Sequence, residues 1–341
     1  MRLGLNTGYW SAGPPAGVTE QIKAAERLGF DTMWTAEAYG SDALTPLAWW
    51  GSQTTKLRLG TAIMQMSART PAAAAMAAIT MDHLSGGRFI LGLGASGPQV
   101  VEGWYGQPYD KPLARTREYV RIVRDIIARE KPVEFDGKFY QMPARGGSGL
   151  GKPLKATVHP LRNNIPIVLG AEGPKNVALA AEIADGWLPL FFSPKSDEFY
   201  RNAIAEGMAK RTAPPVNGEF EVFSLIPTII GDDAEQCADM VRPMLALYMG
   251  GMGAKGANFH FDVFARMGWL SVCEQVQSLY LGGDKAAAMK AIPLELVEDV
   301  ALVGPADKVV AESEKWKKTC ITEVLVSGPV PVLEKIAEVL G

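Results

Sequence analysis

The sequence is poor in the residues that build covalent or metal-linked frameworks. Only three of its 341 residues are cysteine, and only three are histidine. They are Cys237, Cys273, Cys320, His83, His159 and His260. The cysteines are widely spaced and form no C-x-x-C pair, which argues against a disulfide framework and against a thiolate zinc site. The histidines lack the i, i+4 spacing of a metal site carried on a helix, so we expect reduced thiols and no metal.

The sequence also lacks a large net charge and a long apolar run. Lys and Arg number 34 against 37 Asp and Glu, and the net charge of -3 gives no electrostatic footprint for nucleic acid. No run approaches about 18 consecutive apolar residues, so we expect no membrane span. The chain begins with Met1-Arg2 and continues into LGLNTGYW without an apolar signal region. We therefore expect a cytoplasmic protein.

What the sequence does contain is a regular alternation of strand and helix patterns. The pattern predicts a strand over residues 2–8, an amphipathic helix over 18–28 that ends at Gly29, and a strand over 30–36. Such a βαβ unit is typical of a parallel sheet with a right-handed crossover. The alternation continues with a helix at 45–53, a strand at 57–63, a helix at 71–84 and a strand at 89–93.

These repeated units limit the fold class. Four of them at the start of the chain favour either a (β/α)8 barrel or a doubly wound α/β sheet. The first strand is not followed by G-x-G-x-x-G, which argues against a dinucleotide-binding Rossmann fold. The length suits one barrel with insertions. We therefore predict an α/β fold, a (β/α)8 TIM barrel, with residues 1–341 forming a single domain.

Two segments interrupt the expected barrel. Residues 130–165 are rich in Gly and Pro and alternate around Asp136-Gly137 like a β-hairpin, so we predict an excursion there. Residues 234–301 are helix-rich and too numerous for one barrel connection, which predicts a helical insertion. The other expected elements are helices at 113–129, 174–183, 196–210, 306–319 and 330–339, and strands at 165–169, 186–190, 220–230 and 323–326.

Residues 81–97, MDHLSGGRFILGLGASG, form the stretch around which the expected barrel is organised. They indicate a helix end, a Gly-Gly turn, a short buried strand and a loop. Asp82 and Arg88 flank the turn, and we expect an ion pair between them. Gly94, Ser96 and Gly97 leave bare backbone where a ligand could approach, although an isolated GLG is also typical of a tight connection.

This stretch resembles a family signature. The pattern D-x-L-S-x-G-R-[FI]-x-L-G-x-G is similar to the fourth-strand motif of the luciferase-like superfamily, which contains flavin monooxygenases and deazaflavin-dependent hydride-transfer enzymes. The resemblance covers nearly the whole chain and is densest over residues 4–95 and 166–195. Residues 35–48, TAEAYGSDALTPLA, resemble the branch that uses coenzyme F420, an 8-hydroxy-5-deazaflavin with a phosphate-bearing tail.

Candidate site residues follow the expected strands, because a (β/α)8 barrel builds its site at the carboxyl ends of the strands. No Ser-His-Asp set or paired catalytic carboxylates follow these strands, so their residues indicate a cofactor cradle. After the first four strands we expect the cofactor to contact Asn6, Tyr39, Ala62, Ile63, Gln65, Ser96 and Gly97. Tyr39, Met64 and Trp104 are candidates for the wall of an apolar substrate pocket, although each alone is also typical of plain core.

The motif GAEGPKN after the fifth strand indicates an anion site. Its glycines free the backbone amides, and Pro174 suits the first position of a helix whose amino end favours phosphate. An ordinary Gly-Pro helix start is the alternative. The cofactor-contacting residues expected here are Gly170, Ala171, Glu172, Gly173, Pro174 and Asn176, with Lys195 after the next strand as a further positive charge.

The resemblance also implies two local features. The third strand of F420-dependent relatives ends in a bulge with a non-proline cis peptide bond that supports the deazaflavin ring, and GTAIMQM aligns there, so we expect that bond between Ala62 and Ile63. Sugar-phosphate dehydrogenases of this family carry an Asp-His pair after the second strand, where this chain has Glu37 and Ala38. Glu37 is then the candidate acid/base or ring-contacting group, or it only bonds neighbouring amides.

The resemblance implies an oxidoreductase that moves a hydride between coenzyme F420 and a small organic substrate such as an alcohol, a carbonyl compound or an enone. One alternative is an FMN-dependent luciferase-like monooxygenase, and another is a non-catalytic flavin- or deazaflavin-binding protein. Relatives commonly dimerise through barrel helices, so the expected partners are a small-molecule substrate and a second copy of the chain.

Overall fold

The computed structural model describes residues 1–253, 256 and 258–341, and in them eight parallel strands close into a barrel. The barrel strands are β1 (Arg2–Asn6), β2 (Thr32–Thr35), β3 (Arg58–Thr61), β5 (Phe89–Gly94), β8 (Ile167–Gly170), β9 (Gly186–Leu188), β10 (Glu221–Leu225) and β13 (Glu323–Val326). They pair in the order β3, β2, β1, β13, β10, β9, β8, β5, and β5 also pairs with β3, which closes the barrel. The predicted (β/α)8 barrel is confirmed.

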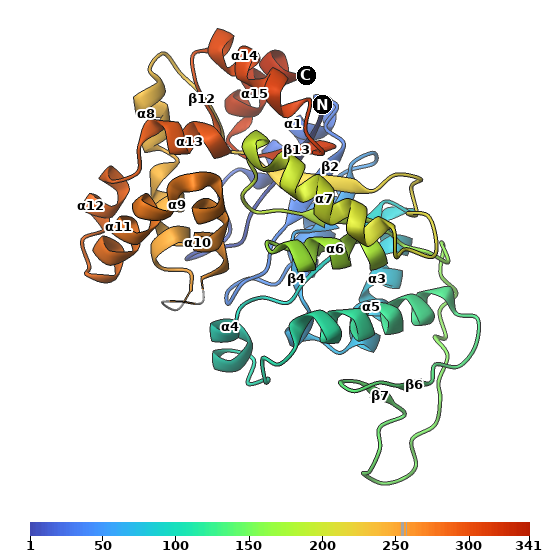
Figure 1. The fold of residues 1–341 in the computed structure, drawn as a ribbon. Helices are drawn as coiled ribbons and strands as arrows, with labels where there is room; N and C mark the ends of the chain where they lie inside the picture. Colours follow the sequence, from blue (N-terminus) through green and yellow to red (C-terminus); the bar gives the residue numbers. More distant parts are fainter. Residues whose placement is uncertain (254–255, 257) are drawn as a thin grey trace.

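Helices connect the strands and surround the barrel (Figure 1). They are α1 (Val18–Arg27), α2 (Leu44–Gly51), α3 (Pro71–Ser85), α5 (Pro112–Ala128), α6 (Pro174–Ile183), α7 (Asp197–Met208), α14 (Ala306–Trp316) and α15 (Val330–Leu340). Local sequence sets their ends. The Thr70 hydroxyl accepts a hydrogen bond from the Ala73 amide at 3.2 Å, and α3 stops at Gly86, whose φ of 67° suits glycine.

The barrel interior changes character along its axis. Buried apolar side chains, including Trp34, Phe223 and Leu325, fill its centre. At the amino ends of the strands, Arg58 lies 3.0 Å from a Glu221 oxygen and 3.4 Å from Glu323. This charged cluster closes the amino end, so the carboxyl end is left for chemistry.

Helices occupy most of residues 234–301, where the sequence predicts a helical insertion. It contains α8 (Ala234–Asp239), α9 (Arg242–Gly250), α10 (Phe259–Phe264), η3 (Ala265–Trp269), α11 (Leu270–Leu281), α12 (Lys285–Lys290) and α13 (Leu294–Val300). These helices share a hydrophobic core that also includes Phe191, which comes from the loop after β9. The insertion, orange in Figure 1, is therefore joined to the carboxyl end of the barrel.

The predicted strand at 220–230 is wrong as one element. The chain leaves the barrel after β10, and β11 (Thr228–Ile230) pairs instead with β12 (Leu302–Gly304). Pro227 lies between β10 and β11 and has no amide hydrogen for a ladder, while its carbonyl accepts a bond from the Leu302 amide at 2.9 Å.

The excursion contains the predicted hairpin. β6 (Phe135–Asp136) pairs antiparallel with β7 (Gln141–Met142), and Figure 1 shows the hairpin projecting from the barrel. Small elements also occur near the strand ends. These are β4 (Met64–Gln65), η1 (Met66–Ala68), α4 (Pro98–Gly103) and η2 (Pro194–Ser196).

The predicted ion pair between Asp82 and Arg88 is wrong. Asp82 binds Arg162 instead, with an Nη2 to Oδ1 distance of 2.5 Å. Arg88 donates to the Leu57 carbonyl at 2.5 Å and to the Thr54 hydroxyl at 3.1 Å. The Gly86-Gly87 turn, with φ of 67° and 85°, lies between the two side chains, and each finds a partner distant in sequence.

Candidate active site

The end of the third barrel strand has the bulge that the resemblance implied. The Ala62–Ile63 peptide bond is cis, as predicted. The Ile63 side chain takes the space of two missing side chains, because a Cβ at Gly94 would lie 2.6 Å from Ile63 Cδ1 and one at Gly170 would lie 3.0 Å from Ile63 Cγ2. The expectation that Gly94 leaves backbone bare for a ligand is therefore corrected: this glycine makes room for Ile63.

Glu37 has a partner that the sequence did not reveal. Arg69, which follows η1, donates from Nη1 to both carboxylate oxygens of buried Glu37 at 2.9 Å. The Tyr105 hydroxyl lies 3.5 Å from Oε1. Two hydrogen bonds from one guanidinium nitrogen fix the position of the Arg69 side chain, so Glu37 holds Arg69 in place.

Gln65 offers an unused hydrogen-bond acceptor beside this bulge. Its Nε2 donates to the Glu37 carbonyl at 3.3 Å, which fixes the orientation of the amide. Its Oε1 is buried and has no partner in the described part of the chain. Because buried acceptors are rarely left unpaired, this oxygen is a candidate for an N–H group of a ligand.

The start of α6 is open, as an anion site requires. No side chain caps this helix end, and a Cβ at Gly173 would meet nothing within 4 Å. Pro174 and Asn176 are exposed, whereas Ala171 is buried and its carbonyl accepts a bond from Trp187 Nε1 at 2.8 Å. The amino end of α6 is therefore accessible, and Ala171 serves the packing beneath it.

Lys195 forms an ion pair with the insertion. Its ammonium lies 2.7 Å from Asp299 of α13, and Trp269 Nε1 donates to the same carboxylate at 2.9 Å. This ion pair connects η2 to the insertion. Lys195 thus helps to position the insertion at the barrel end.

The other expected contacts take different positions. Asn6 Oδ1 accepts a bond from the Gly8 amide at 3.3 Å, at the end of β1. Ser96, with φ of 59°, and Gly97 lead into α4.

Tyr39 and Trp104 are exposed, so both remain available to a ligand. Met64 is fully buried and belongs to the core rather than to a pocket wall.

The insertion adds a histidine that sequence reasoning did not place in the site. His260 Nδ1 lies 4.0 Å from Glu172 Oε1, and that oxygen accepts a bond from the Leu190 amide at 3.1 Å. Glu172 Oε2 and His260 Nδ1 are buried without a partner among the described residues. The ring of His260 packs edge-on against Tyr248, with centroids 4.8 Å apart.

Burial shifts the titration of both groups toward the neutral form. It raises the pKa of Glu172 to about 8, against smaller opposing effects of the Leu190 amide and Arg266. It lowers the pKa of His260 to about 4. Near neutral pH the pair therefore contains a protonated carboxyl group beside an uncharged imidazole.

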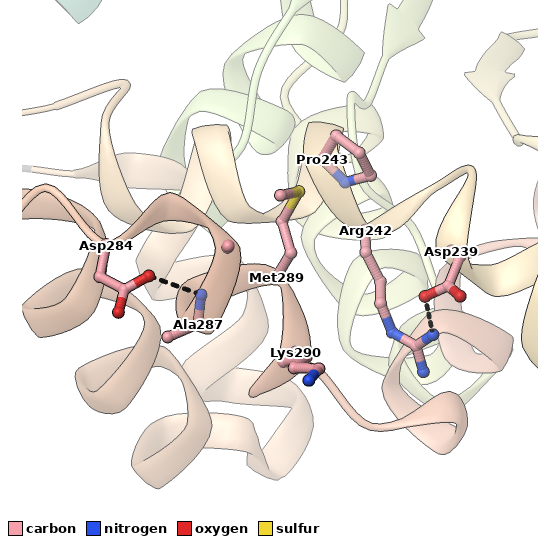
Figure 2. Close-up of a pocket in the computed structure, with 8 residues that line it drawn as sticks. Asp239, Arg242, Pro243, Asp284, Ala287, Met289 and Lys290 are labelled. Carbon is pink, nitrogen blue, oxygen red and sulfur yellow. Dashed lines mark hydrogen bonds and ion pairs between the residues drawn. The ribbon is translucent and has the colours of Figure 1, made fainter.

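Another cavity lies away from the barrel strands. Figure 2 shows it in the insertion, with a volume of about 580 Å³ and lined by residues of α8, α9 and α12 and the turn before α12. Arg242 is paired there with Asp239 and Glu235, each at 2.6 Å, and Asp284 caps α12 through the Ala287 amide at 2.9 Å. No barrel strand contributes to its lining, and its arginine is paired with two carboxylates, so we do not assign a ligand to it.

In residues 1–253, 256 and 258–341, no group of three or more His, Cys, Asp or Glu is arranged to hold a metal ion. Within the same residues, the helices are too short or too polar to cross a membrane.

Comparison with known proteins finds relatives that match almost the whole chain. The family model for luciferase-like monooxygenases matches residues 3–323. A Mycobacterium tuberculosis protein named "Putative coenzyme F420-dependent oxidoreductase Rv3520c" is 55% identical over 330 residues, 96% of this chain and 95% of that protein. The 5,10-methylenetetrahydromethanopterin reductase of Archaeoglobus fulgidus is 29% identical over 326 residues, 94% and 92% of the two chains.

Solved structures show the same fold. The coenzyme F420-dependent tetrahydromethanopterin reductase from Methanopyrus kandleri superposes with a TM-score of 0.79 at 24% identity, over 99% of this chain and 97% of that one. An F420-dependent secondary alcohol dehydrogenase in complex with an F420-acetone adduct gives 0.77 at 18% identity, over 99% and 98%. The chain belongs to the luciferase-like monooxygenase family.

Proposed function

We propose that this protein is a coenzyme F420-dependent oxidoreductase that moves a hydride between the deazaflavin and a small organic substrate: an alcohol, a carbonyl compound or an enone. The observation that carries the proposal is the 55% identity, over 96% of the chain, to a relative named as an F420-dependent oxidoreductase. The proposal extends to the substrate class, for which the exposed Tyr39 and Trp104 provide apolar surface beside the strand ends.

The residues at the strand ends fit this cofactor. Gln65 presents a buried unpaired oxygen, which suits the imide N–H at the polar edge of a deazaflavin ring. Ile63 lies at the adjacent bulge and gives the ring an apolar support. The open amino end of α6 suits the phosphate of the cofactor tail, because its amides and its helix dipole favour an anion.

When bound, coenzyme F420 supplies or accepts the hydride, and the protein must manage the accompanying proton. Glu37 was the acid/base candidate from the sequence, but both of its carboxylate oxygens already accept hydrogen bonds from Arg69. Glu172 is better suited to hold an exchangeable proton near pH 7, because burial raises its pKa to about 8. We therefore assign the proton to Glu172 and a positioning role to Glu37.

Turnover tests the proposal directly. The protein loaded with oxidised F420 is mixed with a panel of alcohols, and the protein with reduced F420 with carbonyl compounds and enones, while the visible absorbance of the deazaflavin is followed. We expect substrate-dependent change with at least one class. Glu172→Gln should lower kcat about 100-fold or more if Glu172 transfers the proton, whereas the exposed control Glu206→Gln should not change it.

The alternative activity is an FMN-dependent monooxygenase, which the family description favours. It predicts oxygen uptake with reduced FMN and no change of F420 absorbance with any substrate. Binding of F420 without turnover across the whole panel would instead indicate a non-catalytic binding protein.

We also propose a homodimer formed through α2 and α3, which pack against each other. This face carries Trp49, Met76 and Leu84, whose side chains are 74%, 64% and 74% exposed. Large exposed apolar side chains on neighbouring helices are typical of an interface. Sedimentation should give a dimer at micromolar concentration and a monomer for Met76→Glu; a monomeric wild-type protein overturns the proposal.

A further inference from the structure

A second cavity lies beside the carboxyl ends of β3 and β5. It has a volume of about 310 Å³ and is formed by four separate parts of the chain. One part is η1 with the residues up to Thr70, another is Ala95 after β5, and the third runs from α4 into the first turn of α5, which carries Arg115. The aromatic ring of Tyr140, from the excursion hairpin, completes the lining.

Arg115 is a cation without an anion. Its guanidinium lies over the ring of Phe139, 4.8 Å from the centroid, and over that of Tyr140 at 6.0 Å. Among the described residues, no carboxylate oxygen lies within 4.0 Å of it, and its Nε is buried without a hydrogen-bond partner. By contrast, Arg69 in the same lining is bound to Glu37. Burying a guanidinium donor without a partner is unfavourable, so the free energy of this arrangement would improve when an anion enters.

Ser67 gives a second, independent indication in the same cavity. Its hydroxyl oxygen is buried and has no hydrogen-bond partner in the described part of the chain. A hydroxyl and a guanidinium are a donor set suited to carboxylate or phosphate oxygens. The one carboxylate in the lining, Asp110, belongs to an exposed residue, so solvent screens its charge.

We propose that this cavity binds an oxyanion, a carboxylate or a phosphate, carried by a ligand that occupies the strand ends, with Arg115 and Ser67 as its donors. The volume lies at the small end of the range of about 300–1,000 Å³ for small-molecule sites, so it suits one polar end of a ligand as large as F420 rather than the whole cofactor. The proposal rests on the proposed function for the identity of the ligand. The anion belongs either to the cofactor tail or to an acidic substrate, beyond the phosphate position at α6.

Inorganic phosphate tests the cavity without any cofactor. Phosphate is titrated into the apo-protein while tyrosine and tryptophan fluorescence is followed, for the wild type, Arg115→Met and Ser67→Ala. Arg115→Met keeps the contact with the two rings but removes the charge. We expect the dissociation constant of phosphate to rise about tenfold or more in Arg115→Met. Arg115→Lys should retain part of the affinity.

The matched control is Arg121→Met, on the same helix, because Arg121 is exposed and paired with Asp125 at 3.0 Å. It should bind phosphate as the wild type does, and thermal unfolding must show that all variants are folded. Equal phosphate affinity in wild type and Arg115→Met overturns the inference. If Arg115→Met loses phosphate affinity but the wild type binds no F420, the inference about the cavity is supported and the proposed function fails.

Ligand comparison identifies the source of the anion. If the cofactor tail supplies it, Arg115→Met raises the dissociation constant of F420 about tenfold or more and leaves that of the tail-less deazaflavin riboside unchanged. If the substrate supplies it, F420 affinity is unchanged and KM rises only for substrates that carry a carboxylate or phosphate. No effect on F420 or on anionic substrates contradicts the assignment to a ligand at the strand ends.

Discussion

At the scale of the residue, the pairing of Glu37 with Arg69 decides how charge is arranged at the strand ends. The Glu37 carboxylate is buried and accepts two hydrogen bonds from a single nitrogen of Arg69. Removal of one partner from a buried pair leaves an uncompensated charge, which is more costly than the net contribution of the intact pair. The two residues should therefore respond unequally to substitution.

We predict that Arg69→Met lowers the free energy of unfolding by about 3 kcal/mol, because it leaves the Glu37 carboxylate buried and unpaired. Glu37→Gln should cost less, because the amide oxygen can still accept a bond from Arg69. Urea unfolding measures both. The exposed control Arg121→Met should change stability by about 0.5 kcal/mol or less. Equal losses for Arg69→Met and Arg121→Met would show that the pair is not buried in solution.

Glu172 predicts a pH dependence of stability. Burial raises its folded-state pKa to about 8 from an ordinary value of 4.5, so the folded protein retains the proton that the unfolded chain has lost. Stability contributed by this group is therefore present below pH 4.5 and falls as the pH rises toward 8. Relative to Glu172→Gln, the wild type should lose about 2–4 kcal/mol between pH 5 and pH 8.

Denaturant unfolding of both proteins at several pH values measures this difference, and Glu206→Gln, at an exposed carboxylate, is the control. A constant difference between wild type and Glu172→Gln across this range would mean that Glu172 is ionised in the folded protein. In that case the assignment of the exchanged proton to Glu172 would also be wrong.

Single residues were predicted from the sequence only where the partner was local or the motif was long. The resemblance of GTAIMQM placed the cis bond correctly at Ala62–Ile63. The partner of Asp82 was mispredicted, because Arg162 is 80 residues away and no periodic pattern connects the two. His260 was missed for the same reason, since its proximity to Glu172 exists only after the insertion has folded.

At the scale of the element, the bulge after β3 depends on glycines in two neighbouring strands. Gly94 of β5 and Gly170 of β8 both make room for the Ile63 side chain. Close-packed interiors tolerate little extra volume, and an added methyl group here must displace Ile63 or the backbone that carries it. The third, fourth and fifth barrel strands thus form one packing unit at the site.

We predict that Gly94→Ala lowers the free energy of unfolding by about 1–3 kcal/mol, because its Cβ would lie 2.6 Å from Ile63 Cδ1. Displacement of Ile63 should also weaken F420 binding, which fluorescence titration measures. Gly103→Ala is the matched control, since a Cβ at that position in α4 meets nothing within 4 Å. Unchanged stability and affinity in Gly94→Ala would show that Ile63 is not held by this contact.

Element boundaries followed the local chemistry of their ends. The helix predicted at residues 174–183 matches α6, because Pro174 marks the first helical position clearly. The strand predicted at residues 323–326 matches β13. The strand predicted at 220–230 failed at Pro227, whose position inside an apolar run was not read as a break. Both outcomes depend on proline, which starts helices and interrupts ladders.

At the scale of the whole molecule, the barrel could be predicted but the arrangement of the insertion could not. Repeated βα units determine the order of parallel strands and bring their carboxyl ends together. The insertion has no such repeat, and it packs on the barrel through Phe191 and through the ion pair of Lys195 with Asp299. The cavity at Arg115 was missed similarly, because four separate segments form it.

The central claim is that this barrel binds a deazaflavin, and a parallel titration of the purified apo-protein with F420 and FMN tests it most directly. Fluorescence gives both dissociation constants under the same conditions. The account predicts that FMN binds about tenfold or more weakly than F420. Tighter binding of FMN would contradict it and would favour the monooxygenase activity instead.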